Sequence, residues 1–85
     1  MFNQLNQLKK LKELRDSLEK EKTEVEKEGV KIIVNGKLEV EFVQLNPELQ
    51  KEEQEKIVRE CINEAIKKVQ IIAAQKMSQM TGLNL

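Results

Sequence analysis

The sequence is poor in the residues from which catalytic and metal sites are most often built. It has no His, Trp or Tyr, only two Phe, and a single Cys, Cys61. Without His, the chain lacks both a common zinc ligand and the base that most often activates a nucleophilic thiol. A lone Cys cannot form an internal disulfide, so we expect a reducing, cytoplasmic environment. We therefore expect no metal and no cofactor.

Long apolar runs and an excess of charge of one sign are also missing. No stretch approaches the roughly 18 apolar residues that a membrane span requires, and residues 1–10 lack the apolar centre of a signal peptide. Basic and acidic residues number 15 each, so the formal net charge is zero. A chain of 85 residues forms at most one small domain with a limited core. We expect a single domain over residues 1–85, no membrane partner, and a homodimer that buries the remaining apolar surface.

The first segment carries leucines at helical spacing. They recur every three or four residues and so line one side of a helix: Leu5, Leu8, Leu11, Leu14 and Leu18. The segment is also rich in Lys, Glu and Gln, which favour helices. We predict a helix from Met1 to about Lys22. Beyond it, residues 23–28 alternate weakly and predict a short, solvated strand.

The stretch 29–47 contains the strongest strand pattern. Apolar residues occupy every second position on both sides of Asn35-Gly36, a dipeptide typical of hairpin turns: Val30, Ile32 and Val34, then Leu38, Val40 and Phe42. A two-residue loop would place the two rows on opposite faces of the sheet. A three-residue loop over residues 34–36, with Gly36 in the left-handed region, would pair Ile32 with Leu38. We prefer this loop, because both rows then share one core face.

A second helix is predicted to begin at Asn46-Pro47. Asn is a favoured N-cap, and Pro is favoured at the first helical position. From Ile57 the apolar residues fall on one face: Val58, Cys61, Ile62, Ala65, Ile66, Val69, Ile72, Ala73, Met77 and Met80. With Gly82 as the stop signal, the helix would be about 33 residues or roughly 50 Å long. It must overhang a three-stranded sheet, so we expect the first helix to pack along it.

Charges are distributed unevenly along the chain. Residues 1–15 carry an excess of three basic groups, and residues 65–85 contain three Lys and no acid. Residues 16–28 and 46–64 each carry an excess of three acids. If the two helices pack antiparallel, their basic ends meet at one tip above an acidic middle. The candidate DNA-contacting residues are the cations of this tip: Lys9, Lys10, Lys12, Arg15, Lys67, Lys68 and Lys76.

A positive tip on a neutral protein favours a polyanion as its partner. We predict duplex DNA, bound through phosphates, because such contacts are sequence-independent and need only accessible cations. A second interpretation of the same charges stays open. Lysines near the end of a helix complement its dipole, and a charged face can serve solvation alone.

No group of residues predicts an enzyme. Glu24, Glu26 and Glu28 alternate along the first strand, where solvent rather than a cleft would surround them. Cys61 belongs to the apolar stripe of the second helix, which favours a packing role. Asn35-Gly36 indicates a turn, not a phosphate-binding loop, because no helix follows it. We expect neither catalysis nor a small-molecule substrate.

Several short stretches, taken in order, resemble one known family. They are GVKIIVNG (29–36), Val40 and Val43, NPEL (46–49), NEAIKK (63–68), and KM (76–77) followed by TGL (81–83). Together with the opening MFN (1–3) and the Leu/Gln/Lys-rich first helix, this set is similar to the YbaB/EbfC nucleoid-associated proteins. Two departures stand out. The Gly-rich turn usual between the first two strands is reduced to Gly29, so that hairpin is tight or its first strand short, and Asn46 replaces an Asp before the Pro.

The resemblance implies an α+β fold: a helix, a three-stranded antiparallel sheet and a long C-terminal helix. It also implies bacterial, tweezer-shaped homodimers that bind DNA in the nucleoid with little sequence preference. The family has neither an invariant catalytic motif nor one that marks its DNA contacts, so the candidate residues rest on charge. One alternative remains, a dimeric helical module that binds a protein and not DNA. The scarcity of aromatics and the zero net charge favour it.

Overall fold

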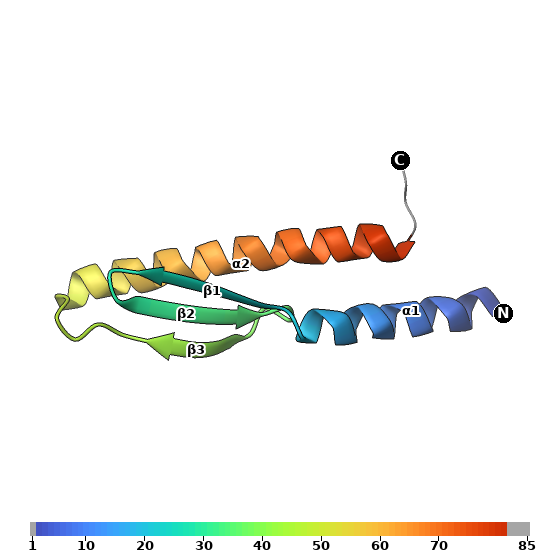
Figure 1. The fold of residues 1–85 in the computed structure, drawn as a ribbon, viewed down its shortest axis with the longest axis horizontal. Helices are drawn as coiled ribbons and strands as arrows, with labels where there is room; N and C mark the ends of the chain where they lie inside the picture. The colour runs from blue at the N-terminus through green and yellow to red at the C-terminus, as the bar shows by residue number, and fades with distance from the viewer. Residues whose placement is uncertain (1, 82–85) are drawn as a thin grey trace.

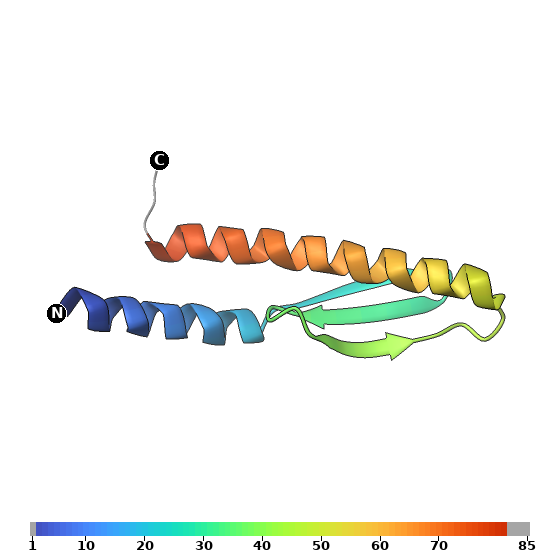
Figure 2. The same ribbon diagram turned by 180° about the vertical axis from the view of Figure 1, so that it is seen from behind.

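The computed structural model describes residues 2–81 and places five elements along them. They are α1 (Phe2–Glu19), β1 (Lys22–Lys27), β2 (Val30–Asn35), β3 (Val40–Gln44) and α2 (Lys51–Thr81). The strands form one antiparallel sheet in the order β1-β2-β3. α2 packs along β1 and β2, while α1 leaves one end of the sheet and runs beside the second half of α2 (Figures 1 and 2). The predicted α+β fold is confirmed.

A two-residue turn joins β1 to β2. Lys27 pairs with Val30, which leaves Glu28 and Gly29 with φ angles of 48° and 84°. Two positive φ angles are typical of a type I′ turn, whose twist suits a tight hairpin. Of the two possibilities left open by Gly29, the tight hairpin is therefore the one observed. β1 is a full strand of six residues, and α1 ends before it, three residues earlier than predicted.

The loop between β2 and β3 has the predicted length but lies two residues further along the chain. The Asn35 N–H donates to the Glu39 carbonyl oxygen at 2.9 Å, so residues 36–38 form the loop. Leu38, with a φ of 65°, occupies the left-handed position that was predicted for Gly36. Ile32 consequently pairs with Val43. The predicted loop and register are therefore wrong.

The side chain of Asn35 explains why the loop forms at this place. Its Oδ1 accepts hydrogen bonds from the N–H groups of Lys37 and Glu39 at 2.9 and 3.1 Å. Its Nδ2 donates to the carboxylates of Glu39 and Glu41 at 3.1 and 2.9 Å. Asn35 thus satisfies four partners only if it precedes the loop, as the last residue of β2, rather than lying within it.

A bulge in β3 separates apolar residues that were predicted to share one face. Val34 pairs with Val40 but Ile33 pairs with Phe42, which makes Glu41 the additional residue. Directly opposed residues share a face of the sheet. Val40 therefore lies on the side covered by α2, and Phe42 lies on the opposite side with Ile33. The prediction of one apolar face holds for β2 and is wrong for β3.

The core lies between α2 and the two strands that it covers. Eight buried residues form it: Val25, Val30, Ile32, Val34, Ile57, Cys61, Ala65 and Val69. Thr23 is buried with them, and its hydroxyl has no hydrogen-bond partner in the described part of the chain. All five residues of β3 are exposed, because the helix does not extend over this strand.

α2 begins four residues later than the predicted start at Pro47. Asn46 instead organises a turn, in which its Oδ1 accepts from the Glu48 N–H at 3.0 Å and its carbonyl accepts from the Leu49 N–H at 3.1 Å. Its Nδ2 donates to the Glu28 carbonyl oxygen at 2.8 Å and so ties this turn to the β1–β2 hairpin. The side chain is engaged in these tertiary contacts, and the helix starts only at Lys51. The predicted stop at Gly82 lies outside the described residues.

Candidate nucleic-acid interface

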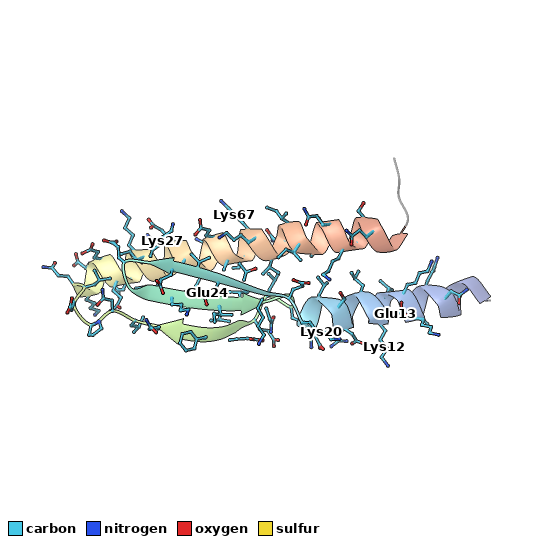
Figure 3. The ribbon with its side chains drawn as sticks, viewed as in Figure 1. Lys12, Glu13, Lys20, Glu24, Lys27 and Lys67 are labelled. Atoms are coloured by element: carbon cyan, nitrogen blue, oxygen red, sulfur yellow. The ribbon has the colours of Figure 1, made fainter. Side chains whose placement is uncertain are left out.

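The outer part of α1 presents a group of exposed cations. Lys9, Lys10 and Lys12 precede Glu13, the first acidic residue of the chain, and all three side chains are exposed. Arg15 is exposed one turn further along the helix. In Figure 3, Lys12 projects from α1 on the side away from α2. Since the first turns of α1 also extend past the described end of α2 (Figure 1), these cations are accessible to a large ligand.

Nearer the sheet, opposite charges balance the cations of α1. Glu19 forms an ion pair with Lys37 from the β2–β3 loop. The hydrogen bond and positive charge of Lys37 lower the pKa of Glu19, and the charge of Arg15 lowers it further. Glu19 therefore stays ionised and offsets part of the Arg15 charge. The uncompensated positive charge of α1 is concentrated at residues 9–12.

Of the three α2 residues in the predicted set, Lys76 is the one that reaches α1. Its Nζ donates to the Ser17 Oγ at 2.7 Å and lies 3.0 Å from the Glu21 Oε1. Its side chain is only 26% exposed. Lys76 therefore lies between the two helices rather than on an open surface.

Lys67 and Lys68 lie apart from the α1 cations. Eight residues separate Lys68 from Lys76, and eight separate Lys9 from Ser17, in helices that run in opposite directions. At 1.5 Å per residue, Lys9 and Lys68 are offset by about 24 Å along the helix axes. In Figure 3, Lys67 also projects away from α1, opposite to Lys12. The structure therefore brings the basic helices side by side but does not gather all seven cations at one tip.

Sequence reasoning missed an apolar surface along β3. Residues of both faces of this strand are 44–49% exposed, namely Val40, Phe42 and Val43, and Leu45 just beyond it is 52% exposed. A groove of about 480 Å³ separates this end of β3 from α2 and is lined by Leu45, Val58 and Ile62 together with Lys51 and Arg59. The register pairs Val43 with Ile32 on the α2 side of the sheet, and Val43 stays exposed because α2 does not extend over β3.

The described residues contain no candidate metal site, no activated thiol and no membrane-spanning helix. No cluster of His, Cys, Asp or Glu among them could hold a metal ion. Burial raises the pKa of the Cys61 thiol, which is the opposite of what a nucleophile requires. No helix in residues 2–81 has the length and apolarity to cross a bilayer.

Comparison with known proteins identifies the family. The YbaB/EbfC DNA-binding family matches residues 1–84, and the chain belongs to this family. It is 33% identical over 60 residues to a nucleoid-associated protein of Caldicellulosiruptor bescii, covering 66% of this chain and 53% of that protein. It is 32% identical over 57 residues to a nucleoid-associated protein of Caldicellulosiruptor saccharolyticus, covering 62% and 50%. The chain thus spans about half the length of these relatives. No solved structure matches it.

Proposed function

We propose that this protein is a homodimeric component of the bacterial nucleoid that binds duplex DNA through phosphates, with little sequence preference. The observation that supports this most directly is the exposed, acid-free group Lys9, Lys10 and Lys12 on a helix that projects from the sheet. Membership of a DNA-binding family and the names of the two relatives agree with it. Such a partner places the protein in the cytoplasm, at the chromosome.

Phosphate binding fits the chemistry of this helix better than base recognition does. Lysines are flexible point charges, which suit contacts to a backbone of regular charge. Lys67 and Lys68 form a second, smaller cationic site on α2, and a long duplex that follows the molecule could contact it as well. Because each neutralised phosphate releases counterions, the affinity should fall steeply as salt rises.

The test is a salt titration of duplex binding by the parent and by the variant in which Lys9, Lys10 and Lys12 are all Glu. We expect the variant to bind all sequences more weakly. The slope of the logarithm of its binding constant against the logarithm of the salt concentration should be shallower by about 0.9 for each phosphate that it no longer neutralises. The matched control changes the same charge at Lys20, Lys27 and Lys56, which are exposed and lie outside both the candidate set and the groove beside β3. Equally weakened binding in both variants would show an effect of net charge alone. An unchanged affinity in the first would refute the α1 site.

The two edges of the sheet support the proposal that β3 forms the dimer contact. On β1, the exposed residues are charged: Lys22, Glu24, Glu26 and Lys27. Charges on an edge strand discourage pairing with another chain. β3 has the opposite character, with unpaired backbone groups on its outer edge and exposed apolar residues on both faces. An antiparallel edge can pair with its own copy about a two-fold axis, and the groove beside it would then receive apolar side chains.

Mass measurement by sedimentation tests the dimer contact. Val43→Glu and Phe42→Glu place a charge on the two faces of β3, and both should shift the protein towards monomers at concentrations where the parent is dimeric. Glu26→Lys on the opposite edge is the control and should leave the mass unchanged. If the two β3 variants remain dimers, the contact lies elsewhere.

A dimer that shows no DNA binding at low salt, yet retains a protein partner after nuclease treatment, would select the alternative of a protein-binding module.

A further inference from the structure

The apolar contact between α1 and α2 is short. Leu14 is the one buried residue among residues 6–19 of α1, at 8% exposure. Ser17 and Leu18 are half-buried, whereas Leu8 and Leu11 are 64% and 59% exposed. The contact therefore covers little more than one turn of α1. Apolar packing of this extent is too small by itself to fix the direction of an 18-residue helix.

The end of α1 is instead held from two sides. On the side of the sheet, the Gly36 N–H donates to the Glu21 carbonyl oxygen at 3.0 Å, and Lys37 pairs with Glu19. On the side of α2, the contact comes from Lys76, through its bonds to Ser17 and Glu21.

We propose that Lys76 is a positioning residue that sets the separation of α1 from α2, and that it does not contact DNA itself. This inference rests on the proposed function, since the separation matters because α1 carries the cations proposed to bind phosphates. Three observations support it. Both partners of Lys76 lie at the base of α1, its side chain is mostly buried between the helices, and its charge is already paired. A lysine that binds phosphate would have to leave these partners.

Charge reversal at Lys76 distinguishes positioning of α1 from direct contact with a DNA phosphate. If Lys76 positions α1, Lys76→Glu should let α1 move and weaken duplex binding, and the exchanged pair Lys76→Glu with Glu21→Lys should restore both. If Lys76 contacts a phosphate, the exchange cannot restore binding, because an acid then faces the DNA. We expect binding to weaken about two- to fivefold in the single variant, the range of one partly exposed ion pair. Glu21→Lys completes the double-mutant cycle. Lys56→Glu, the same charge change at an exposed residue in the first half of α2 and outside the candidate set, is the matched control.

The separation of the helices is measured directly, without DNA. Spin labels at Asn6→Cys and Gln75→Cys report the distance within one protomer when labelled protein is diluted with unlabelled protein. The parent without added cysteines measures residual labelling of the buried Cys61. We expect a longer and broader distance distribution for Lys76→Glu, the parent distribution for Lys76→Arg and for the exchanged pair, and no change for Lys56→Glu.

The two readouts distinguish failure of this inference from failure of the proposed function. An unaltered distance distribution in Lys76→Glu would overturn the positioning role, whatever the DNA result. So would an exchanged pair that regains the distance but binds duplex as weakly as the single variant. Absence of DNA binding by the parent would refute the proposed function, and the distance measurement would still decide whether Lys76 positions α1.

Discussion

Gly36 lies against the carbonyl oxygen of Leu18. A β-carbon built on Gly36 would be 1.8 Å from that oxygen, far inside any real contact. The approach is close because the β2–β3 loop packs onto the last turn of α1, where the Gly36 N–H bonds to the Glu21 carbonyl. Gly36 is therefore required for space and not for a positive φ, since Gly29 is the glycine with a left-handed conformation. This contact joins α1 to the sheet.

Gly36→Ala should destabilise the protein by about 1–3 kcal/mol, because α1 or the loop must move to admit the methyl group. Urea unfolding at one fixed protein concentration measures the change, since the stability of the proposed dimer would depend on concentration. Lys20→Ala, an exposed change two residues beyond Leu18, is the control. Equal stability of Gly36→Ala and the parent would show that the close approach relaxes without cost.

Leu38→Gly should stabilise the protein by about 0.5–1 kcal/mol. Leu38 holds a φ of 65°, which a side chain with a β-carbon adopts only at a cost, and its side chain is half exposed. Lys37→Gly is the matched control in the same loop. Its φ is not positive, so the added chain entropy and the lost ion pair with Glu19 should both lower the stability of this variant. A lower melting temperature for Leu38→Gly would mean that its apolar contacts outweigh the backbone strain.

Thr23→Val should raise the free energy of unfolding by about 1 kcal/mol. The Thr23 hydroxyl is buried and has no hydrogen-bond partner within residues 2–81, and Val has nearly the same shape without the polar group. Thr23→Ala is the comparison, since it removes the hydroxyl but also a methyl group, and the cavity should offset the gain. If the Thr23→Val variant is less stable than the parent, the Thr23 hydroxyl has an interaction that the structure does not contain.

Acid should weaken the fold through Glu41. The hydrogen bond from Asn35, followed by that from Lys22, lowers the pKa of Glu41 below its ordinary 4.5. A carboxylate with a lowered pKa contributes stability above the unfolded pKa and loses it as the pH falls through the folded value. Glu41→Gln should therefore be less stable than the parent near neutral pH, and the difference should vanish as the pH falls below the lowered pKa of Glu41. Denaturant midpoints across this range check the prediction, and a difference that does not change with pH would contradict it.

The sequence was sufficient for the order and type of the elements but not for their junctions. Helical and alternating spacing follow directly from which face of an element is buried, so β2 and the first half of α2 were predicted with the residues that pack. α1 buries Leu14 of its predicted stripe but leaves Leu8 and Leu11 exposed. Asn35, Gly36 and Asn46 were each interpreted by local rules for turns and caps. Asn35 bonds to residues 37–41 of its own hairpin, whereas Gly36 and Asn46 contact distant segments, namely α1 and the β1–β2 turn. Such contacts cannot be deduced from neighbours in the chain.

The candidate site likewise has features that the sequence predicts and features that depend on tertiary structure. The exposed lysines of α1 follow from composition and spacing, because Lys9, Lys10 and Lys12 fall between the leucine positions of the helical pattern. The separation of Lys67 and Lys68 from this group depends on the offset between the antiparallel helices, which Lys76 and Ser17 define. That offset is a tertiary property. The apolar edge at β3 was not predicted, because the extent to which α2 covers the sheet is also a tertiary property and the misplaced loop gave β3 the wrong register.

The position of Asn35 also bears on the chemical durability of the protein. An Asn followed by Gly is open to attack by the next backbone nitrogen, which converts the amide to a carboxylate. Here both ends of the amide are held by hydrogen bonds, and the folded chain is therefore protected. Conversion during an unfolded interval would place a third carboxylate beside Glu39 and Glu41, so the damaged copy could not rebuild the loop that joins α1 to the sheet.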